Sequence, residues 1–377
     1  MRRYLIAIGI LSLLVGLFFI ISCREDGEIK IGVSVSLTGA DSLFGISIRN
    51  GVEYAVDEIN SNGGVNGKMI RLLVKDDQNN KDKAIEDDSE LIDKGVCAII
   101  GHVSSSITKA VLPLMTEKKM LLLSPTVSSN DIILENEMLI SLGSSNRIIQ
   151  KTLADYMTEQ DKIKRLAIIY DANNQEYSNY WLEVIRSYLS GTDVQIVDVL
   201  SFDSSVVYTD FYLLALNLIS KKPDGVLMIA TSLHTASLSQ QLYKIDPNIK
   251  KYTTTWAFDN MLIENGGESV ESLVLTTPYD RYSEDSVYLS FKEGFTKRYG
   301  TEPEFSSAYA YETTSVLYQA LLKVPDCDPE KIRDEILSIG SFKGLSAKIE
   351  INPSGLSSRE AFLYIIENSK YKKIPIE

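Results

Sequence analysis

A histidine and three consecutive serines follow an apolar segment near residue 100. The stretch "IIGHVSSSIT" (99–108) places His102 two and three positions before Ser104 and Ser105. A nucleophilic serine needs a histidine within hydrogen-bonding reach and an acid that orients this histidine. Close sequence neighbours rarely reach that geometry, and the chain has no GxSxG elbow. We therefore expect no enzymatic activity, and we assign these hydroxyls to helix capping or anion binding.

Three loops share this hydroxyl-rich composition: "SLTGADSLFG" (36–45), "GHVSSS" (101–106) and "SPTVSSND" (124–131). Each follows an apolar run typical of a strand. In α/β proteins, ligands bind beyond the carboxyl ends of strands, where N–H groups at helix starts attract anions such as carboxylates. Capping of the next helix by the same hydroxyls is the alternative interpretation, and one group can do both.

The composition argues against nucleic-acid binding and metal chemistry. The formal net charge is −13, so the chain would repel nucleic-acid phosphates. Two histidines and no CxxC motif leave too few ligands for a zinc site. We interpret Asp76 and Asp77 as a solvated strand end, and we expect neither a metal nor a cofactor. Cys97 and Cys327 could pair in an exported protein, but nothing in their spacing requires it, and we expect free thiols.

The first residues have the pattern of an export signal. Arg2 and Arg3 precede an apolar stretch, which ends in "IISC" with Ser22 before Cys23. This ending resembles a bacterial lipoprotein box, in which the cysteine carries the lipid. We predict a signal peptide over 1–22, lipidation of Cys23 and a tether over 23–28. An uncleaved membrane anchor is the alternative, since the apolar stretch could nearly span a bilayer.

Strand-like apolar runs alternate with amphipathic segments from residue 28 onward. The predicted strands are "IKIGVSVS", "MIRLLVKD", "VCAIIGH", "MLLLSP", "RLAIIYD", "VQIVDVLSF", "GVLMIAT", "YTTTWAF" and "LVLTTPY". The predicted helices are Ser47–Asn60, Lys81–Lys94, Ser105–Glu117, Arg147–Glu159, Tyr177–Ser190, Thr209–Ser220, Thr235–Ile245 and Ser286–Tyr299. This alternation indicates parallel sheets covered on both faces. The pattern restarts near residue 165, so we expect an α/β fold with two similar doubly wound lobes.

From Ile29 to about Ile366 the chain resembles the leucine/isoleucine/valine-binding family of ABC-transporter solute-binding proteins. The matching segments include "KIGVSVSLTGADSLFG", "NGVEYAVDEINSNGGVNGKMIRLLVKDDQ", "IIGHVSSSIT", "LLLSPTVSS", "RLAIIYD", "GESVESLVLTTPY" and "AYAYETTSVL". The resemblance implies a type I periplasmic binding protein fold with a hinge of three crossings, near 143–146, 276–279 and 353–355. Lobe one would then comprise 28–145 plus 278–353, and lobe two 146–277 plus 354–377.

The resemblance also implies a set of ligand contacts. Ser105 and Ser128 would hold a carboxylate, and the backbone of Thr126 and Val127 would face the ligand. The full set of implied ligand-binding residues is Phe44, Ser105, Thr126, Val127, Ser128, Asn146, Tyr177, Thr231, Trp256, Asp259 and Tyr309.

Two departures from the family pattern bear on the ligand. The family's glutamate that receives an α-ammonium group falls at Thr255 or Trp256, with Asp259 a few residues further on. Either Asp259 takes that role, or the Trp256 ring faces the cation, or the ligand has no α-ammonium group. The family's lobe-one disulfide falls at Asn79 and Ser104, so that bridge is absent.

We expect, from this resemblance, a monomeric lipid-anchored protein outside the cytoplasm. It would capture a small carboxylated solute, an amino acid (including branched-chain ones) or a related organic acid. The solute would be delivered to the permease subunits of an ABC transporter. A ligand-sensing receptor or regulator ectodomain of the same fold is the alternative function.

Overall fold

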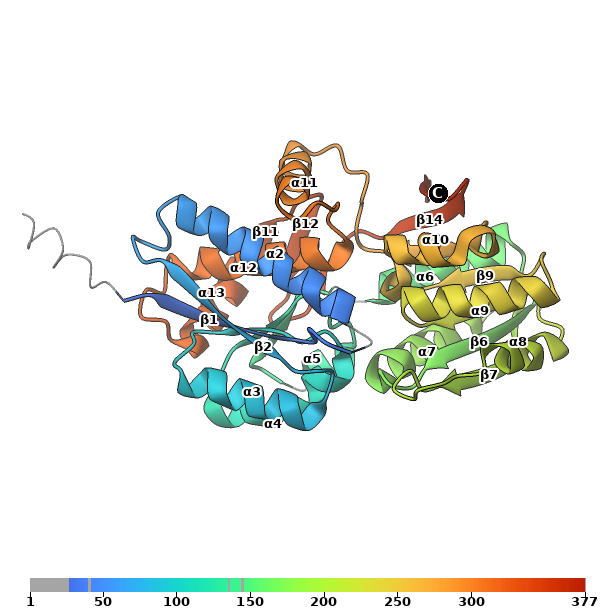
Figure 1. The fold of residues 1–377 in the computed structure, drawn as a ribbon, viewed down its shortest axis with the longest axis horizontal. Coiled ribbons are helices and arrows are strands. Elements are labelled where there is room, and N and C mark those ends of the chain that lie inside the picture. The colour runs from blue at the N-terminus through green and yellow to red at the C-terminus, as the bar shows by residue number, and fades with distance from the viewer. Residues whose placement is uncertain (1–26, 40–41, 135, 144–145, 377) are drawn as a thin grey trace, which may run out of the picture.

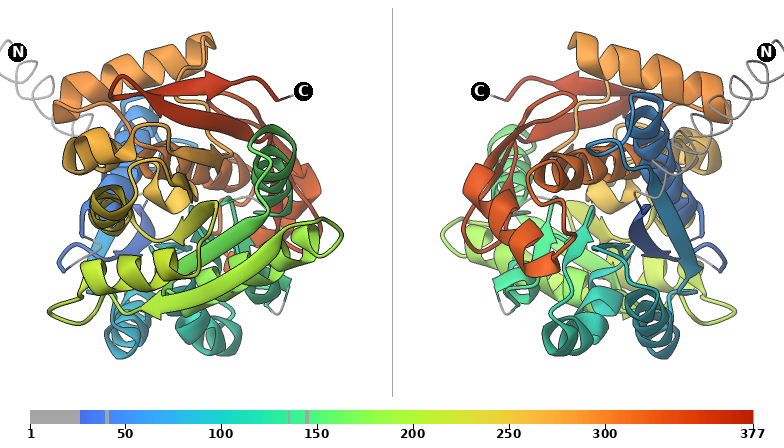
Figure 2. Two further views of the ribbon diagram at one scale, coloured as in Figure 1. Left: turned by 90° about the vertical axis from the view of Figure 1, so that its right-hand side faces the viewer. Right: turned by 90° about the vertical axis from the view of Figure 1, so that its left-hand side faces the viewer.

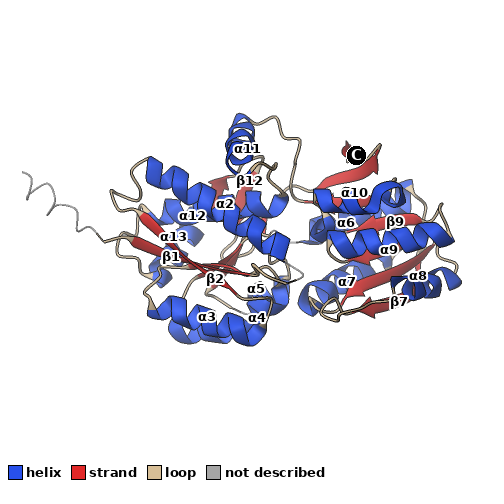
Figure 3. Cartoon of the chain, viewed as in Figure 1, coloured by secondary structure: helices blue, strands red, loops and turns tan. Residues whose placement is uncertain are grey.

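Two helix-covered sheets form two lobes that lie side by side (Figures 1 and 3). The computed structural model describes residues 27–376, apart from 40–41, 135 and 144–145. The expected signal peptide, Cys23 and most of the tether lie outside the described residues. Within the described part of the chain, no helix combines the length and the apolar character needed to cross a membrane.

The first sheet has five parallel strands in the order β2-β1-β3-β4-β5. These strands are β1 (Ile29–Val35), β2 (Ile70–Asp76), β3 (Ile99–Gly101), β4 (Leu122–Ser124) and β5 (Leu139–Ser141). Its helices are α2 (Ser42–Ser61), α3 (Lys81–Asp93), α4 (Ser105–Lys118), α5 (Asn130–Leu134), α12 (Phe305–Leu321) and α13 (Pro329–Ile339). The strands are almost wholly apolar because α2 and α12 cover one face while α3 and α4 cover the other (Figure 1).

The second sheet has seven strands in the order β15-β14-β10-β9-β8-β6-β7. The strands are β6 (Arg165–Asp171), β7 (Gln195–Phe202), β8 (Gly225–Ile229), β9 (Lys250–Thr253), β10 (Val274–Thr277), β14 (Phe362–Glu367) and β15 (Lys370–Ile374). The helices α6 (Asn146–Asp155), α7 (Gln175–Leu189), α8 (Phe211–Ser220), α9 (Ser232–Ile245) and α10 (Asn260–Gly266) surround it. The strands from β7 to β10 are parallel, whereas β14 and β15 add an antiparallel edge.

The predicted doubly wound α/β fold with two lobes is confirmed, and most predicted helices lie within a few residues of their observed bounds. The helix α11 (Ser286–Tyr299) has the predicted bounds. The predicted strand "YTTTWAF" is wrong in its second half. β9 ends at Thr253, and Thr255–Ala257 form a 3₁₀ turn because the Thr254 side chain accepts a hydrogen bond from the Trp256 N–H. Residues 300–374 also contain α12, α13 and five strands that the list of predicted elements omitted.

The chain passes between the two sheets three times. It leaves the first sheet after β5, returns after β10, and reaches the second sheet again at β14. Before the last crossing, β11 (Ser341–Lys343), β12 (Lys348–Ile351) and β13 (Ser357–Ser358) form a small antiparallel sheet. The last crossing therefore follows β13, a few residues after the expected 353–355. Figure 2 shows α11 on the same side of the molecule as β14 and β15.

Arg359 joins the crossings to α12. Its guanidinium forms a buried ion pair with Glu312, with Nη1 and Oε2 2.6 Å apart. Its Nε donates to the Leu142 carbonyl at 3.2 Å, and its guanidinium carbon lies 4.2 Å from the centroid of the Tyr309 ring. The other oxygen of Glu312 accepts from the Leu345 N–H at 2.6 Å. One ion pair thus fixes the first and third crossings against the same helix.

Cys97 and Cys327 form a disulfide, with their Cα atoms 5.0 Å apart. The expectation of two free thiols is therefore wrong. Cys97 precedes β3 and Cys327 precedes α13, so the bond ties the last helical segment of the first lobe to its central strands. A sequence separation of 230 residues gave no local signal for this pairing.

His102 is buried between two carboxylates. Its Nδ1 lies 2.8 Å from Asp77 Oδ2, and its Nε2 lies 3.0 Å from Asp88 Oδ2. Asp77 is 1% exposed, so the prediction of a solvated strand end is wrong for this residue. Burial disfavours the charged imidazole, but the charges of Asp88 and Asp77 and the hydrogen bonds to them raise the pKa of His102 to about 10. The histidine is a buried cation that fixes the loop before α4.

The two histidines of the chain are expected to titrate differently. Burial lowers the pKa of His234, whereas His102 holds its proton far above the ordinary range. In NMR titrations, the ring of His102 should stay protonated from pH 6 to 9 while His234 loses its proton below pH 6.5. A His234→Gln variant assigns the two signals. Titration of both rings near pH 6.5 would contradict the buried charge.

The raised pKa of His102 also links stability to pH. The contribution of this group is fully present below the unfolded pKa of about 6.5 and is lost as pH rises through the folded pKa of about 10. The free energy of unfolding from this source should therefore fall by up to about 1.4 kcal/mol per pH unit between those values. Urea unfolding at several pH values measures this slope.

Removal of one partner of the Arg359–Glu312 pair should be strongly destabilising. Arg359→Met leaves a buried carboxylate without its cation, which costs about 3–5 kcal/mol in the free energy of unfolding. Adding Glu312→Gln should recover much of this loss, because the glutamine keeps an acceptor for the Leu345 N–H. Urea unfolding of the two single variants and the double variant tests the coupling. The exposed pair Lys348–Glu350 is the matched control, and its removal should cost less than about 1 kcal/mol.

Candidate functional site

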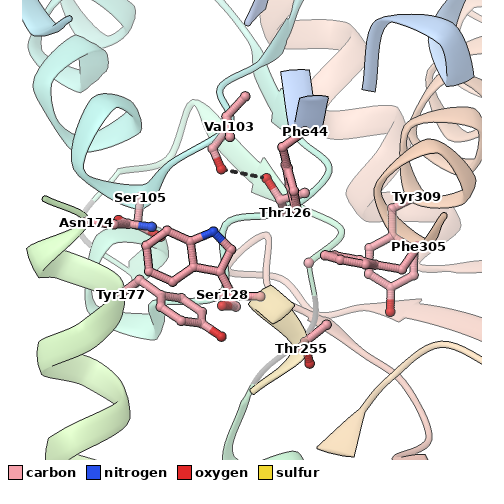
Figure 4. A pocket seen from close by; sticks show the side chains of 12 residues that line it. Phe44, Val103, Ser105, Thr126, Ser128, Asn174, Tyr177, Thr255, Phe305 and Tyr309 are labelled. Carbon is pink, nitrogen blue, oxygen red and sulfur yellow. Dashed lines mark hydrogen bonds between the residues drawn. The ribbon is translucent and has the colours of Figure 1, made fainter. Parts of the chain in front are cut away.

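A cleft lies between the lobes at the carboxyl ends of their parallel strands. It encloses about 460 Å³ of empty space, counted to its open mouth. Loops after β1, β3 and β4 meet loops after β6 and β9 there, as expected for α/β sheets. The 12 lining residues are Phe44, Val103, Ser105, Thr126, Ser128, Gly143, Asn174, Tyr177, Thr255, Trp256, Phe305 and Tyr309 (Figure 4).

The hydroxyl-lined wall comes from lobe one. Ser104 caps α4, since its side chain accepts from the Ile107 N–H, and its own hydroxyl donates to Asn79 Oδ1 at 3.1 Å. Asn79 and Ser104 stand where the family has its lobe-one disulfide, so a hydrogen bond joins the two positions in place of that bond. The next residue, Ser105, begins α4 and lines the cleft, and no hydrogen bond of its hydroxyl occurs among the described residues. This hydroxyl is therefore available to a ligand at a helix N-terminus.

Thr126 and Ser128 continue this wall from the loop after β4. The Thr126 hydroxyl donates to the carbonyls of His102 and Val103, at 3.2 and 3.1 Å (Figure 4). With its proton used in this way, Thr126 can only accept a hydrogen bond from a molecule in the cleft.

The opposite wall comes from lobe two and is aromatic. Tyr177, at the start of α7, meets the Trp256 ring edge-on with centroids 5.3 Å apart. Its hydroxyl donates to Thr254 Oγ1 at 3.1 Å, and burial raises its pKa further above the ordinary range, so the phenol stays neutral. The Thr255 hydroxyl donates to the Thr276 carbonyl at 3.0 Å. These contacts hold the 3₁₀ turn and place Trp256 in the cleft.

A second aromatic group closes the cleft near the hinge. Phe44 and Phe305 meet edge-on at 5.2 Å between centroids, and Phe305 meets Tyr309 at 5.9 Å. The Tyr309 hydroxyl is buried and has no hydrogen-bond partner within the described residues. Because Arg359 covers the same ring, Tyr309 connects the cleft to the hinge.

The structure brings seven of the eleven predicted ligand contacts together. These are Phe44, Ser105, Thr126, Ser128, Tyr177, Trp256 and Tyr309. The residue that follows Thr126, Val127, lies outside the lining, and its N–H donates to Ser124 Oγ. Asn146 begins α6, and its side chain lies outside the described part of the structure. Thr231 precedes α9 and contacts His234 Nδ1 at 2.9 Å.

Asp259 also lies outside the cleft lining. Its carboxylate caps α10 by accepting from the Leu262 N–H, and it accepts from the Ser232 hydroxyl at 2.7 Å. Burial raises its pKa to about 6, although those hydrogen bonds and Arg281 oppose the shift. It faces a neighbouring groove of about 970 Å³, again counted to the open surface, together with Glu304.

Five lining residues are absent from the set of predicted ligand contacts. Thr255 was named only as a position in register with the family's glutamate, and Gly143 only at a hinge crossing. Val103 lies between a predicted strand and a predicted helix, whereas Phe305 lies where no element was predicted. Asn174 lies in the loop before α7, and its Oδ1 accepts from the Ser106 N–H of the other lobe at 3.3 Å. The "DANNQ" loop after a strand was the available signal for Asn174.

The two lobes contact each other on both sides of the cleft. On one side, Ser106 contacts Asn174, and Lys109 pairs with Glu176 at 3.0 Å. On the other side, the Asn260 N–H donates to Glu304 at 3.3 Å. Both contacts join residues of lobe one to residues of lobe two, so they depend on the relative position of the lobes.

Metal chemistry finds no support in the cleft. Among the described residues, no group of three or more histidine, cysteine, aspartate or glutamate side chains could hold a metal ion.

Comparisons with known proteins identify the family. The family model "Periplasmic binding protein" matches residues 28–366. The Leu/Ile/Val-binding protein homolog 2 of Brucella abortus is 25% identical over 341 residues, which is 87% of each chain. The structure of the leucine binding protein LivK from Thermotoga maritima superposes with a TM-score of 0.82 at 25% identity, over 92% of this chain and 98% of that one.

LivJ from Streptococcus pneumoniae, solved with isoleucine, gives a TM-score of 0.84 at 19% identity, over 92% of this chain and 98% of that one. Proteins of this kind are solute-binding proteins that work outside the cytoplasm. With seven predicted contacts gathered in one inter-lobe cleft and a family match over nearly the whole folded part, the chain belongs to the periplasmic binding protein family and is a solute-binding protein, not an enzyme.

Proposed function

We propose that this protein captures a small carboxylated solute in the inter-lobe cleft and delivers it to the permease of an ABC transporter. The observation that carries the proposal is the position of Ser105, which begins α4 and lines the cleft. Its hydroxyl forms no hydrogen bond with another described residue. A helix N-terminus and a hydroxyl donor together suit a carboxylate. Ser128 lines the same wall and would add a second hydroxyl contact.

The opposite wall would select the rest of the solute. Tyr177 and Trp256 present apolar rings from lobe two, and Phe44 and Phe305 present rings from lobe one. A ligand that touches both walls favours the closed arrangement, because the open arrangement lacks half of its contacts. The Ser106–Asn174 and Asn260–Glu304 contacts would form in the same movement.

The names of two relatives support an amino acid or a related carboxylate as the solute and a transporter as the partner. LivK is named as a leucine binding protein, and LivJ as a branched-chain amino acid transporter substrate binding protein in complex with isoleucine. Branched-chain amino acids and related organic acids are accordingly the first solutes to test.

A lipid on Cys23 would hold the protein at the membrane next to its permease. The support is the sequence "IISC" after a basic start and an apolar stretch. A folded domain beginning at β1, close behind the cysteine, would remain near the membrane surface.

Replacement of Ser105 should weaken solute binding and leave the fold intact. Ser105→Ala removes one hydrogen bond to a charged group, which is worth about 1.5–3 kcal/mol, so the Kd should rise about 10- to 100-fold. Isothermal titration with the solute found in a thermal-shift screen measures this change.

Ser237→Ala is the matched control for this variant, because Ser237 is half-buried on α9, outside the cleft lining, and donates to the Leu233 carbonyl of its own helix. This control should leave the Kd unchanged. An unaltered Kd in Ser105→Ala would remove Ser105 from the site.

A further inference from the structure

We infer that the ligand carries a carboxylate and an apolar remainder but no ammonium group on the α-carbon. The favoured solutes are monocarboxylates whose α-carbon bears hydrogen or hydroxyl. This inference rests on the proposed function, since it assigns the carboxylate to the Ser105 wall, and it narrows the solute class within that function.

The cleft lining is uncharged. Of the 12 described residues that line it, five are aromatic, and none is aspartate, glutamate, lysine, arginine or histidine. A buried ammonium group needs a carboxylate partner, because removal of an ion from water costs several kcal/mol when it is left unpaired. The described lining offers no such partner.

Within the described part of the chain, the two carboxylates nearest the inter-lobe contacts, Asp259 and Glu304, have other partners. Asp259 accepts from the Ser232 hydroxyl and the Leu262 N–H, and it does not line the cleft. Glu304 accepts from the Asn260 N–H and lies 3.9 Å from Arg281 Nη2. Both acids line the neighbouring groove, where Asp259 is held within lobe two and Glu304 contacts Asn260 of the other lobe, so neither is placed to receive a ligand cation in the cleft.

A carboxylate meets a different environment in the same cleft. The N-terminus of α4 carries a partial positive charge, and Ser105 adds a hydroxyl donor. The α-carboxylate of an amino acid would therefore find hydrogen-bond donors in the cleft, whereas its α-ammonium group would find no charged acceptor among the described lining residues.

The polar groups that remain suit a neutral α-substituent. The Thr126 hydroxyl donates to backbone carbonyls and can only accept from the ligand. A ligand hydroxyl could donate to such an oxygen without bringing a charge into the cleft. Hydrogen at the α-carbon would instead contact the surrounding rings.

Three matched probes differ only in the α-substituent and test the inference directly. They are L-leucine, 2-hydroxy-4-methylpentanoate and 4-methylpentanoate, and a parallel set is L-phenylalanine, 3-phenyllactate and 3-phenylpropanoate. Isothermal titration at pH 7 should give at least a 10-fold lower Kd for the hydroxy or unsubstituted acid than for the amino acid of the same set.

The outcomes separate this inference from the proposed function. Tighter binding of the amino acids than of the matched acids would overturn the inference and leave the proposed function standing. Tight binding of glycine betaine would have the same consequence, because the aromatic rings would then hold its cation. Failure of all probes to bind would overturn the proposed function and the inference with it.

A charge introduced into the cleft should reverse the preference. Trp256→Glu supplies a carboxylate for an ammonium group, and Trp256→Gln is the matched neutral control. Relative to the control, the glutamate variant should shift the Kd ratio at least 10-fold toward the amino acid. Thr255→Glu with Thr255→Gln is a second pair in case loss of the Trp256–Tyr177 contact prevents folding. An unchanged ratio in folded variants of both pairs would contradict the inference.

Discussion

The buried pair between Arg359 and Glu312 is the contact on which the relation of the two lobes depends. Arg359 lies just before β14, at the third crossing, and its bond to the Leu142 carbonyl fixes the first crossing beside it. Glu312 belongs to α12, which also carries Tyr309 into the cleft. Because separation of the pair would leave a buried charge without its partner, the pair stabilises the packing of both crossings against α12. The same helix lines the cleft through Phe305 and Tyr309, so the cleft is built against the part of the hinge that this pair holds.

Lobe one presents its hydroxyls from a loop that buried polar contacts hold in place. His102 bridges two acids beneath the loop, Ser104 joins it to Asn79, and Thr126 joins it to the neighbouring loop. Lobe two presents aromatic rings from the first turn of α7 and from a 3₁₀ turn. The two walls therefore differ in chemistry: hydroxyl groups of lobe one face aromatic rings of lobe two, which is the arrangement that the proposed carboxylate binding would use.

The loops that follow parallel strands could be predicted from the sequence, whereas the side chains that cross between distant segments could not. Ser105 and Ser128 lie in hydroxyl-rich loops that follow apolar strands, and this local pattern pointed to the loops, whereas the family resemblance singled out the two residues. Asp259 lies outside the cleft lining, because the chain turns at Thr255–Ala257 and the aspartate then caps α10.

The contacts of His102 and the Cys97–Cys327 bond depend on residues far apart in the chain, so no periodicity or capping signal revealed them. Asp77 illustrates the same limit, since a carboxylate at a strand end is exposed unless a partner from another element covers it. The fold class and three loops of the cleft were therefore predictable from local patterns, the individual cleft residues were predicted from the family resemblance, and the buried charges were not predicted.

Those buried charges also explain how an uncharged cleft can be selective. Burial raises the pKa of Glu304 to about 7 and that of Asp259 to about 6, while Arg281 opposes both shifts. Glu304 is held by a contact with Asn260 of the other lobe, and Asp259 is held by hydrogen bonds within lobe two. Neither carboxylate lines the cleft, so neither would pair with a ligand cation there. A cation–π contact with an aromatic ring stabilises a cation by about 0.5–2 kcal/mol, whereas desolvation of an unpaired ion costs several kcal/mol. Under the proposed ligand assignment, discrimination against an ammonium group would need no repulsive residue, because the described lining offers that group no charged partner.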